Sequence, residues 1–121
     1  MAANQLAELQ VRPFQRADQT ATRWLIHEGL GEHFGFIDEP MNPDIDDIHH
    51  HYIRADDTFI VAVHGGEIVG AVALLGECET VGRLVRMSVS SAWRQRGITT
   101  ALVGHLIAAA QERGFFRIIL A

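Results

Sequence analysis

The segment from Val89 to Gly114 constrains the fold of this chain more than any other. It reads VSSAWRQRGITTALVGHLIAAAQERG: the end of an apolar strand, a loop containing Arg94 and Arg96, and a long apolar helix that stops at Gly114. The first N–H groups of a helix lack intrahelical partners and carry partial positive charge, and the two arginines add fixed charge at the same point. The segment therefore predicts an anion site, with a phosphate-bearing ligand as the first hypothesis.

The size and charge of the chain limit what else it can do. Its 121 residues are 48% hydrophobic, which is enough for one core and too little for two, so we expect a single soluble domain over residues 1–121. The formal charge is −5, from 10 Lys and Arg against 15 Asp and Glu. Nucleic-acid and anionic-membrane binders need a broad positive field, so we expect neither partner.

Cysteine and histidine content bears on location and on metals. Cys78 is the only cysteine, which excludes an intrachain disulfide and favours the reducing cytoplasm. Residues 49–51 are three consecutive histidines within an expected helix, where adjacent side chains point in different directions. We therefore expect no metal site. The chain also has no secretory signal and no apolar run near the roughly 20 residues that span a bilayer.

The first half of the chain predicts one strand and two helices. Residues 9–15 alternate between apolar and polar and contain Pro13, which predicts a strand at the edge of a sheet. Asp18 is the expected N-cap of a helix over residues 20–30, which Gly29 and Gly31 would end. A loop rich in Gly, Pro, Asn and Asp then leads to a second helix near residues 45–55.

The second half predicts a sheet with one covering helix. Two apolar runs, DTFIVAVH and EIVGAVALL, flank Gly65-Gly66, which is typical of a β-hairpin whose strands are central and covered on both faces. A third strand follows over residues 80–89, then the helix over residues 97–113 and a last strand over residues 115–121. The expected order of elements is β-α-α-β-β-β-α-β.

With the elements in this order, the chain resembles the GNAT acyltransferases. Their acyl-CoA-binding motif is Arg or Gln, two residues, Gly, one residue, then Gly or Ala, after a strand ending in Val; here the run is RQRGIT, residues 94–99. The resemblance extends through LVRMSV and ALVGHLIAAAQERGFFRIIL to nearly the whole chain. It implies an α/β (α+β) fold: a GNAT-like mixed, mostly antiparallel sheet flanked by helices.

The resemblance also implies acetyl-CoA as cosubstrate. The residues that the motif assigns to it are Arg94, Gln95, Arg96, Gly97, Ile98, Thr99 and Thr100. The pyrophosphate would lie on backbone N–H groups, with Gly97 leaving room for close approach. Thr99 stands where the family has Gly or Ala, so it would either bind phosphate through its hydroxyl, which we favour, or crowd it. The alternative is that the arginines form only a solvated turn.

In the family, the strand before the loop carries a bulge and diverges from its parallel neighbour. That would free backbone groups of Met87, Ser88 and Val89 for the pantetheine arm and the thioester oxygen. The implied reaction is direct attack of an amine on acetyl-CoA in a ternary complex. Backbone N–H groups aimed at the thioester oxygen would stabilise the oxyanion that forms.

The sequence gives fewer clues to the residues of the acceptor half of the site. Glu79, near the start of the strand at 80–89, is a candidate base, although a charged residue beside a turn is more often simply solvated. Glu32 and His33 fall in a loop that family members use to wall the acceptor site. Tyr52, the only tyrosine, is a poor substitute for the tyrosine that protonates the leaving thiolate in longer members.

The expected function is an N-acetyltransferase that acts on a small amine or a protein amino group. The alternatives are a non-catalytic acyl-CoA-binding module and, through WRQR, a nucleic-acid contact that the acidic composition disfavours. GNAT chains usually continue into a further helix and a hairpin, which this sequence lacks; a fragment, a natural short form and a site completed by a second subunit all stay open. Because residues 115–121 form an apolar edge strand, we expect a homodimer through them.

Overall fold

The computed structural model of the protein describes residues 8–34 and 43–120, and its elements follow the predicted order. In chain order they are β1 (Leu9–Pro13), η1 (Arg16–Asp18), α2 (Gln19–Phe34), α3 (Pro43–Asp46), η3 (His49–Ile53), β2 (Thr58–His64), β3 (Glu67–Gly76), β4 (Val81–Val89), η4 (Ser91–Trp93), α4 (Ile98–Glu112) and β5 (Arg117–Leu120). The short elements η1 and η4 are 3-10 turns, and η3 is a π-helical turn.

The sheet has five strands in the order β1-β2-β3-β4-β5. The first four are antiparallel, and β4 and β5 run parallel, so the predicted mixed and mostly antiparallel sheet is confirmed. The β2–β3 hairpin turns at Gly65 and Gly66, whose φ values of 56° and 81° suit residues without a Cβ. As predicted, β1 lies at one edge and the hairpin is central.

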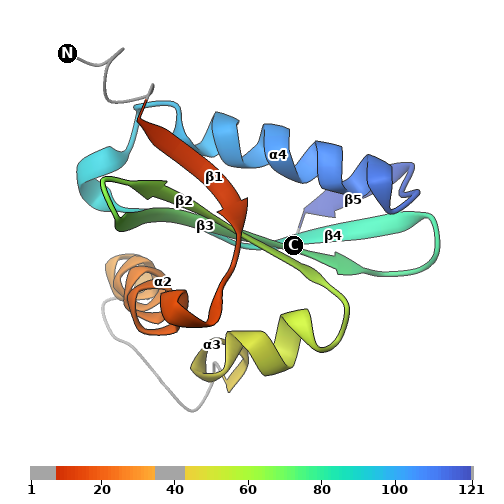
Figure 1. The fold of residues 1–121 in the computed structure, drawn as a ribbon, viewed down its shortest axis with the longest axis horizontal. Coiled ribbons are helices and arrows are strands. Elements are labelled where there is room, and N and C mark those ends of the chain that lie inside the picture. Colours follow the sequence, from red (N-terminus) through yellow and green to blue (C-terminus); the bar gives the residue numbers. More distant parts are fainter. Residues whose placement is uncertain (1–7, 35–42, 121) are drawn as a thin grey trace.

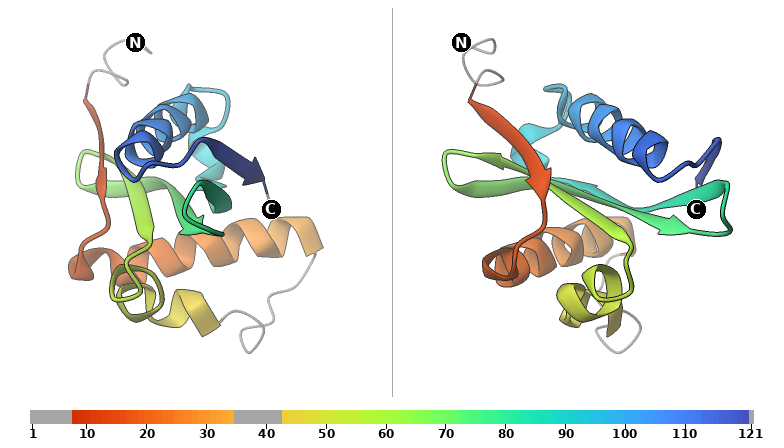
Figure 2. Two further views of the ribbon diagram at one scale, coloured as in Figure 1. Left: turned by 90° about the vertical axis from the view of Figure 1, so that its right-hand side faces the viewer. Right: turned by 45° about the vertical axis from the view of Figure 1, so that its right-hand side comes forward.

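Helices cover both faces of the sheet (Figures 1 and 2): α4 packs on one face, and α2 with α3 on the other. Two apolar clusters fill the layers. The α4 side is built around Ile60, Ala62, Val69, Val72, Leu74, Ile98, Leu102, Leu106 and Ala110, and the α2 side around Phe14, Leu25, Ile26, Ile45, Ile48, Tyr52, Phe59, Val61, Val63, Ala71 and Ala73. The α4 residues recur every four positions, which is the apolar stripe of a helix lying on a sheet.

The first turn of α4 sits unusually close to the sheet because β3 carries Gly70 beneath it. A Cβ at Gly70 would lie 2.8 Å from Ile98 Cγ2 and 3.0 Å from Leu102 Cδ1. Carbon atoms in contact normally stay about 3.5–4.0 Å apart, so no larger residue fits there without moving the helix. The sequence of β3 therefore sets where the N-terminus of α4 lies.

The predicted end of the first helix was wrong. Residues 29 and 31 do not stop α2, which runs on to Phe34, so Glu32 and His33 lie in its last turn and not in a loop. A glycine inside a helix costs about 1 kcal/mol relative to alanine, and the burial of Leu25 and Ile26 against the sheet offsets that cost.

The start of α2 also differs from the prediction. Asp18 lies in η1, where its carboxylate accepts the N–H of Gln15 at 2.8 Å and forms a bidentate pair with Arg12 at 2.7 and 3.0 Å. The helical region thus begins at Arg16, two residues before Asp18. The Arg12 guanidinium holds the pKa of this carboxyl below its ordinary value, against the opposing effect of burial.

The second predicted helix is split into α3 and η3. The Gln19 side chain donates to the carbonyl of Ile45 at 2.8 Å and accepts the N–H of Ile48 at 3.0 Å. A continuous α-helix would use both backbone groups for its own i to i−4 bonds. Because Gln19 takes them, the helix breaks after Asp46 and resumes as a π turn, in which Arg54 donates to His49 at 2.9 Å.

Candidate functional site

The loop between β4 and α4 has the backbone shape of an anion cradle. After η4, Arg94 is extended, Gln95 has a φ of 61°, and Gly97 caps α4 with a φ of 86°. Left-handed residues next to ordinary ones turn successive N–H groups to the same side, which creates a concave row of donors. At Gly97 a side chain would be strained as well as in the way.

A cavity of about 270 Å³ lies at this cradle. It is lined by Val89, Trp93, Arg94, Gln95, Gly97, Ile98, Thr99 and Thr100. The first i to i−4 bond of α4 runs from Ala101 to Gly97 at 3.0 Å, so the preceding N–H groups are available to a ligand. The structure thus gathers most of the predicted cofactor residues around one cavity. Arg96 lies beside it, stacked over the Trp93 ring at 5.3 Å.

β5 pairs only with the first part of β4 and does not reach this cavity. The parallel pairing covers only Val81 to Leu84, opposite Arg117 to Leu120. On the other side β4 remains paired with β3, but with a bulge: Ser88 faces Ala71 while Val85 faces Ala73, so two residues of β4 oppose one of β3. The bulge that the family resemblance implied is present in the structure; the described residues of β5 end at Leu120, opposite Leu84, so the implied divergence of the two strands stays a prediction.

After Leu84, the backbone groups on the side of β4 away from β3 have no strand partner among the described residues. Ser90 donates its N–H to Val69 at 2.9 Å, and Ser88 pairs with Ala71. Because N–H groups alternate in direction along a strand, those of Met87 and Val89 point away from β3, and no described strand pairs with them there. Met87 and Val89 also pack toward the α4 side, where the cavity lies.

A second feature at the bulge is an ion pair that sequence reasoning missed. Arg86, with a φ of 58°, donates to both carboxylate oxygens of Asp44 in α3, at 2.9 Å from Nε and 2.6 Å from Nη2. The Tyr52 hydroxyl donates to Asp44 Oδ2 at 2.5 Å. Burial and the bond to Asp44 raise the pKa of Tyr52 well above its ordinary value, so its proton stays in place. The sequence gives no local signal for this pair, because Arg86 is one of two arginines in β4.

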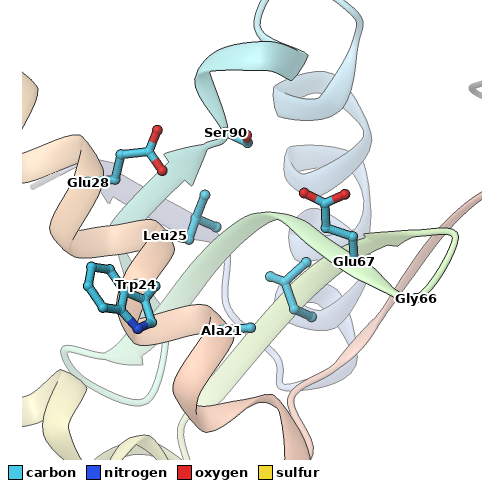
Figure 3. Close-up of a pocket in the computed structure, with 8 residues that line it drawn as sticks. Ala21, Trp24, Leu25, Glu28, Gly66, Glu67 and Ser90 are labelled. Atoms are coloured by element: carbon cyan, nitrogen blue, oxygen red, sulfur yellow. The ribbon is translucent and has the colours of Figure 1, made fainter.

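A larger cavity, of about 430 Å³, opens on the α2 side of the sheet. Figure 3 shows it between α2 and the β2–β3 hairpin, with Glu28 on one side, Glu67 on the other and Ser90 between them. The Ser91 hydroxyl donates to Glu28 at 3.3 Å. Since Val89 lines the α4-side cavity and Ser90 lines this one, the two cavities meet at the end of β4 from opposite faces of the sheet. Sequence reasoning also missed both glutamates.

The structure does not bring Glu79 to this site. It is exposed in the turn before β4, whereas both cavities lie at the far end of that strand. A strand rises about 3.3 Å per residue, which separates Glu79 from Val89 by roughly 30 Å. Glu32 and His33 lie in the last turn of α2, after Glu28, and their side chains fall outside the described residues.

Residues 8–34 and 43–120 contain no group of three or more His, Cys, Asp or Glu side chains placed to hold a metal ion. None of the described helices combines the length and apolar character that crossing a bilayer requires.

A comparison with known proteins identifies the family. The profile of the "Acetyltransferase (GNAT) family" matches residues 4–121, so the chain belongs to that family. It is 34% identical over 90 residues to N-acetyltransferase family 8 member 2 of Rattus norvegicus, a match that covers 70% of this chain and 40% of the relative. The chain therefore spans well under half the length of that curated relative.

Solved structures share the fold. A GNAT-family acetyltransferase from Staphylococcus aureus Mu50 superimposes with a TM-score of 0.86 at 23% identity, over 93% of this chain and 73% of that one. An aminoglycoside 6'-N-acetyltransferase complexed with coenzyme A gives a TM-score of 0.75 at 21% identity, over 92% of this chain and 60% of that one. Together with the family match, these neighbours confirm the predicted fold class.

Proposed function

We propose that this protein transfers the acetyl group of acetyl-CoA to a primary amine. The observation that carries the proposal is the donor-lined cavity at the start of α4, next to the end of β4, whose outer side has no strand partner among the described residues. A pyrophosphate fits the N–H groups from Gln95 to Thr100, with Arg94 and Arg96 adding charge. That a structural neighbour of the same fold is a complex with coenzyme A supports this use of the cavity.

In the proposed reaction, the thioester lies along Met87 to Val89. The amine nitrogen attacks the thioester carbonyl carbon, the C–N bond forms, and the C–S bond then breaks to release CoA. The N–H of Val89, which points away from β3, is a suitable donor to the oxyanion. The nitrogen loses its proton to a base, and the leaving sulfur gains one, so CoA departs as a thiol.

The acceptor is proposed to approach from the α2 side. There Glu28 and Glu67 give the larger cavity a negative wall, which attracts an ammonium group and can accept its proton through water. Contacts from Glu32 and His33 remain part of the proposal. We further propose a cytoplasmic location, because a chain with one cysteine has no intrachain disulfide to form.

The test begins with calorimetry of CoA binding to the wild-type protein, Gly97→Glu and Gly104→Glu. Both variants add one negative charge to α4, but Gly104 lies mid-helix with nothing within 4 Å of an added Cβ. Gly97→Glu should abolish binding in a folded protein, and Gly104→Glu should bind as wild type does. Wild-type affinity in Gly97→Glu would overturn the assignment of the cavity.

Acetyl transfer is then tested by thiol release from acetyl-CoA with spermidine, glucosamine and a peptide with a free α-amino group. Thiol release that depends on one of these amines supports the enzyme. CoA binding without thiol release from any of them would favour the alternative of a non-catalytic acyl-CoA-binding module.

A further inference from the structure

The bulge in β4 decides which residues face the proposed thioester. Leu84 packs toward α4 and Val85 toward α2, as alternation requires, but Arg86 then reaches Asp44 on the same side as Val85. Two consecutive side chains thus share one face. After the bulge, Met87 and Val89 return to the α4 face. In a regular strand, both these side chains and their N–H groups would point the opposite way.

The bulge lies in a part of β4 that pairs irregularly. At residues 86 and 87 its ladder with β3 is interrupted, and the described residues of β5 reach only as far as Leu84. Arg86 also adopts a left-handed φ of 58°, which a residue with a branched or long side chain rarely holds without outside constraint.

The ion pair with Asp44 supplies this constraint on Arg86. The two bonds from Arg86 to Asp44 join β4 to α3 across 42 residues of sequence, and the Tyr52 hydroxyl binds the same carboxylate from η3. Tyr52 is only 5% exposed and packs edge-on against Phe59 of β2, with ring centroids 5.0 Å apart. The carboxylate that holds Arg86 is therefore itself held by the core.

We propose that Arg86, fixed by Asp44 and Tyr52, is a positioning residue that selects the bulged register of β4 and so aims the N–H of Val89 at the acyl thioester. This inference rests on the proposed acetyl transfer. Arg86 does not touch the reacting atoms; it acts through the backbone that follows it.

The decisive comparison is Arg86→Gly against Arg86→Ala. Both lose the ion pair, but glycine adopts the left-handed φ freely and alanine does not. If Arg86 positions the bulge, kcat with acetyl-CoA and the best amine of the panel should fall at least about tenfold in Arg86→Ala and recover substantially in Arg86→Gly. Equal kcat values in the two variants, or wild-type kcat in Arg86→Ala, would overturn the proposal.

A matched ion pair controls for general loss of stability. Arg12 and Asp18 form a similar bidentate pair between β1 and η1, away from both cavities. Asp44→Asn should lower kcat while the Kd for CoA stays within about twofold of wild type, because the phosphate cradle is a separate unit. Asp18→Asn should lower the melting temperature without lowering kcat. A fall in kcat of the same size in both variants would reduce Asp44 to a purely structural role.

A readout that does not need activity separates this inference from the proposed function. Hydrogen exchange at the Ser88 amide, which pairs with β3 after the bulge, should accelerate in Asp44→Asn and, more mildly, in Tyr52→Phe, but not in Asp18→Asn. If the wild type neither binds CoA nor acetylates an amine but exchange follows this pattern, the proposed function fails, while the role of Arg86 in selecting the bulged register of β4 stands. Unchanged exchange at Ser88 in Asp44→Asn refutes that role.

Discussion

Replacing Gly70 with alanine should lower both the stability of the protein and its affinity for CoA, because the added methyl group disturbs the packing of α4. The added Cβ would lie 2.8 Å from Ile98 Cγ2, so relief to a normal contact of about 3.5 Å requires a shift of about 0.7 Å. Overpacking of this kind costs about 1–3 kcal/mol, and the lower entropy of the unfolded chain returns about 0.4–1 kcal/mol. The net loss of unfolding free energy is about 1–2 kcal/mol.

This loss converts into measurable quantities. For 121 residues, an unfolding entropy near 2.1 cal/mol/K per residue makes 1 kcal/mol worth about 4 °C, so the melting temperature should fall by about 4–8 °C. Ile98 directly follows Gly97, so the shift also moves the first N–H groups of α4. Loss of about 1 kcal/mol of hydrogen bonding there weakens CoA binding roughly fivefold.

Thermal melting and calorimetry on the wild type and four variants test this prediction; the variants are Gly70→Ala, Gly104→Ala, Ile98→Ala and the double variant at residues 70 and 98. Gly104→Ala, on the solvent side of the same helix, should raise the melting temperature and leave the CoA affinity unchanged. Gly70→Ala combined with Ile98→Ala should destabilise by less than the sum of the single changes, because the clashing methyl is gone. A Gly70→Ala protein that melts at or above the wild-type temperature would refute the packing argument.

Three other predictions follow from the same structure. Thr99→Gly should weaken CoA binding in calorimetry if the Thr99 hydroxyl contacts phosphate, as we favour, and preserve or tighten it if the side chain only crowds the site. Asp18 has a folded pKa below its unfolded value of 3.8, so the stability that it contributes to the fold is present above pH 3.8 and is lost as the pH falls below it. Denaturant titrations at pH 3 and pH 6 should show this loss of unfolding free energy in wild type and a smaller one in Asp18→Asn. Phe116 and Leu120 are 89% and 77% exposed, and we propose that residues 115–121 lie at a homodimer interface. In sedimentation at micromolar concentration, wild type should be a dimer and Phe116→Lys a monomer. A monomeric wild type would contradict this proposal.

Local signals explain which parts of the fold could be predicted. The hairpin was predictable because Gly65 and Gly66 supply both left-handed positions of a two-residue turn. The last helix was predictable because its apolar residues recur at helical spacing between Gly97 and Gly114, both of which have positive φ. In each case the residues that determine the element lie within it.

The parts that sequence could not supply depend on distant partners. The break between α3 and η3 is made by Gln19, which binds backbone groups 26 and 29 residues away. The ion pair at the bulge joins residues 42 positions apart, and neither Asp44 nor Arg86 has a local reason to be singled out. Glu79 illustrates the opposite error: closeness in sequence to β4 suggested a role, but the residue lies at the wrong end of that strand.

The position of α4, and with it the phosphate cradle, is determined by the sheet as much as by the motif. Near its start the helix rests on Gly70, and just after its end Phe115 covers Gly82 of β4, where an added Cβ would meet Phe115 at 2.9 Å and Leu74 at 2.7 Å. Both glycines are places where only a hydrogen leaves room: a larger residue at Gly70 must displace side chains of α4, and one at Gly82 must displace Leu74 and Phe115, which follows the helix. The run from Arg94 to Thr100 supplies the donors, but two glycines outside that run decide where those donors point. A chain that carried the motif with larger residues at these two positions should keep the loop chemistry and bind CoA less tightly.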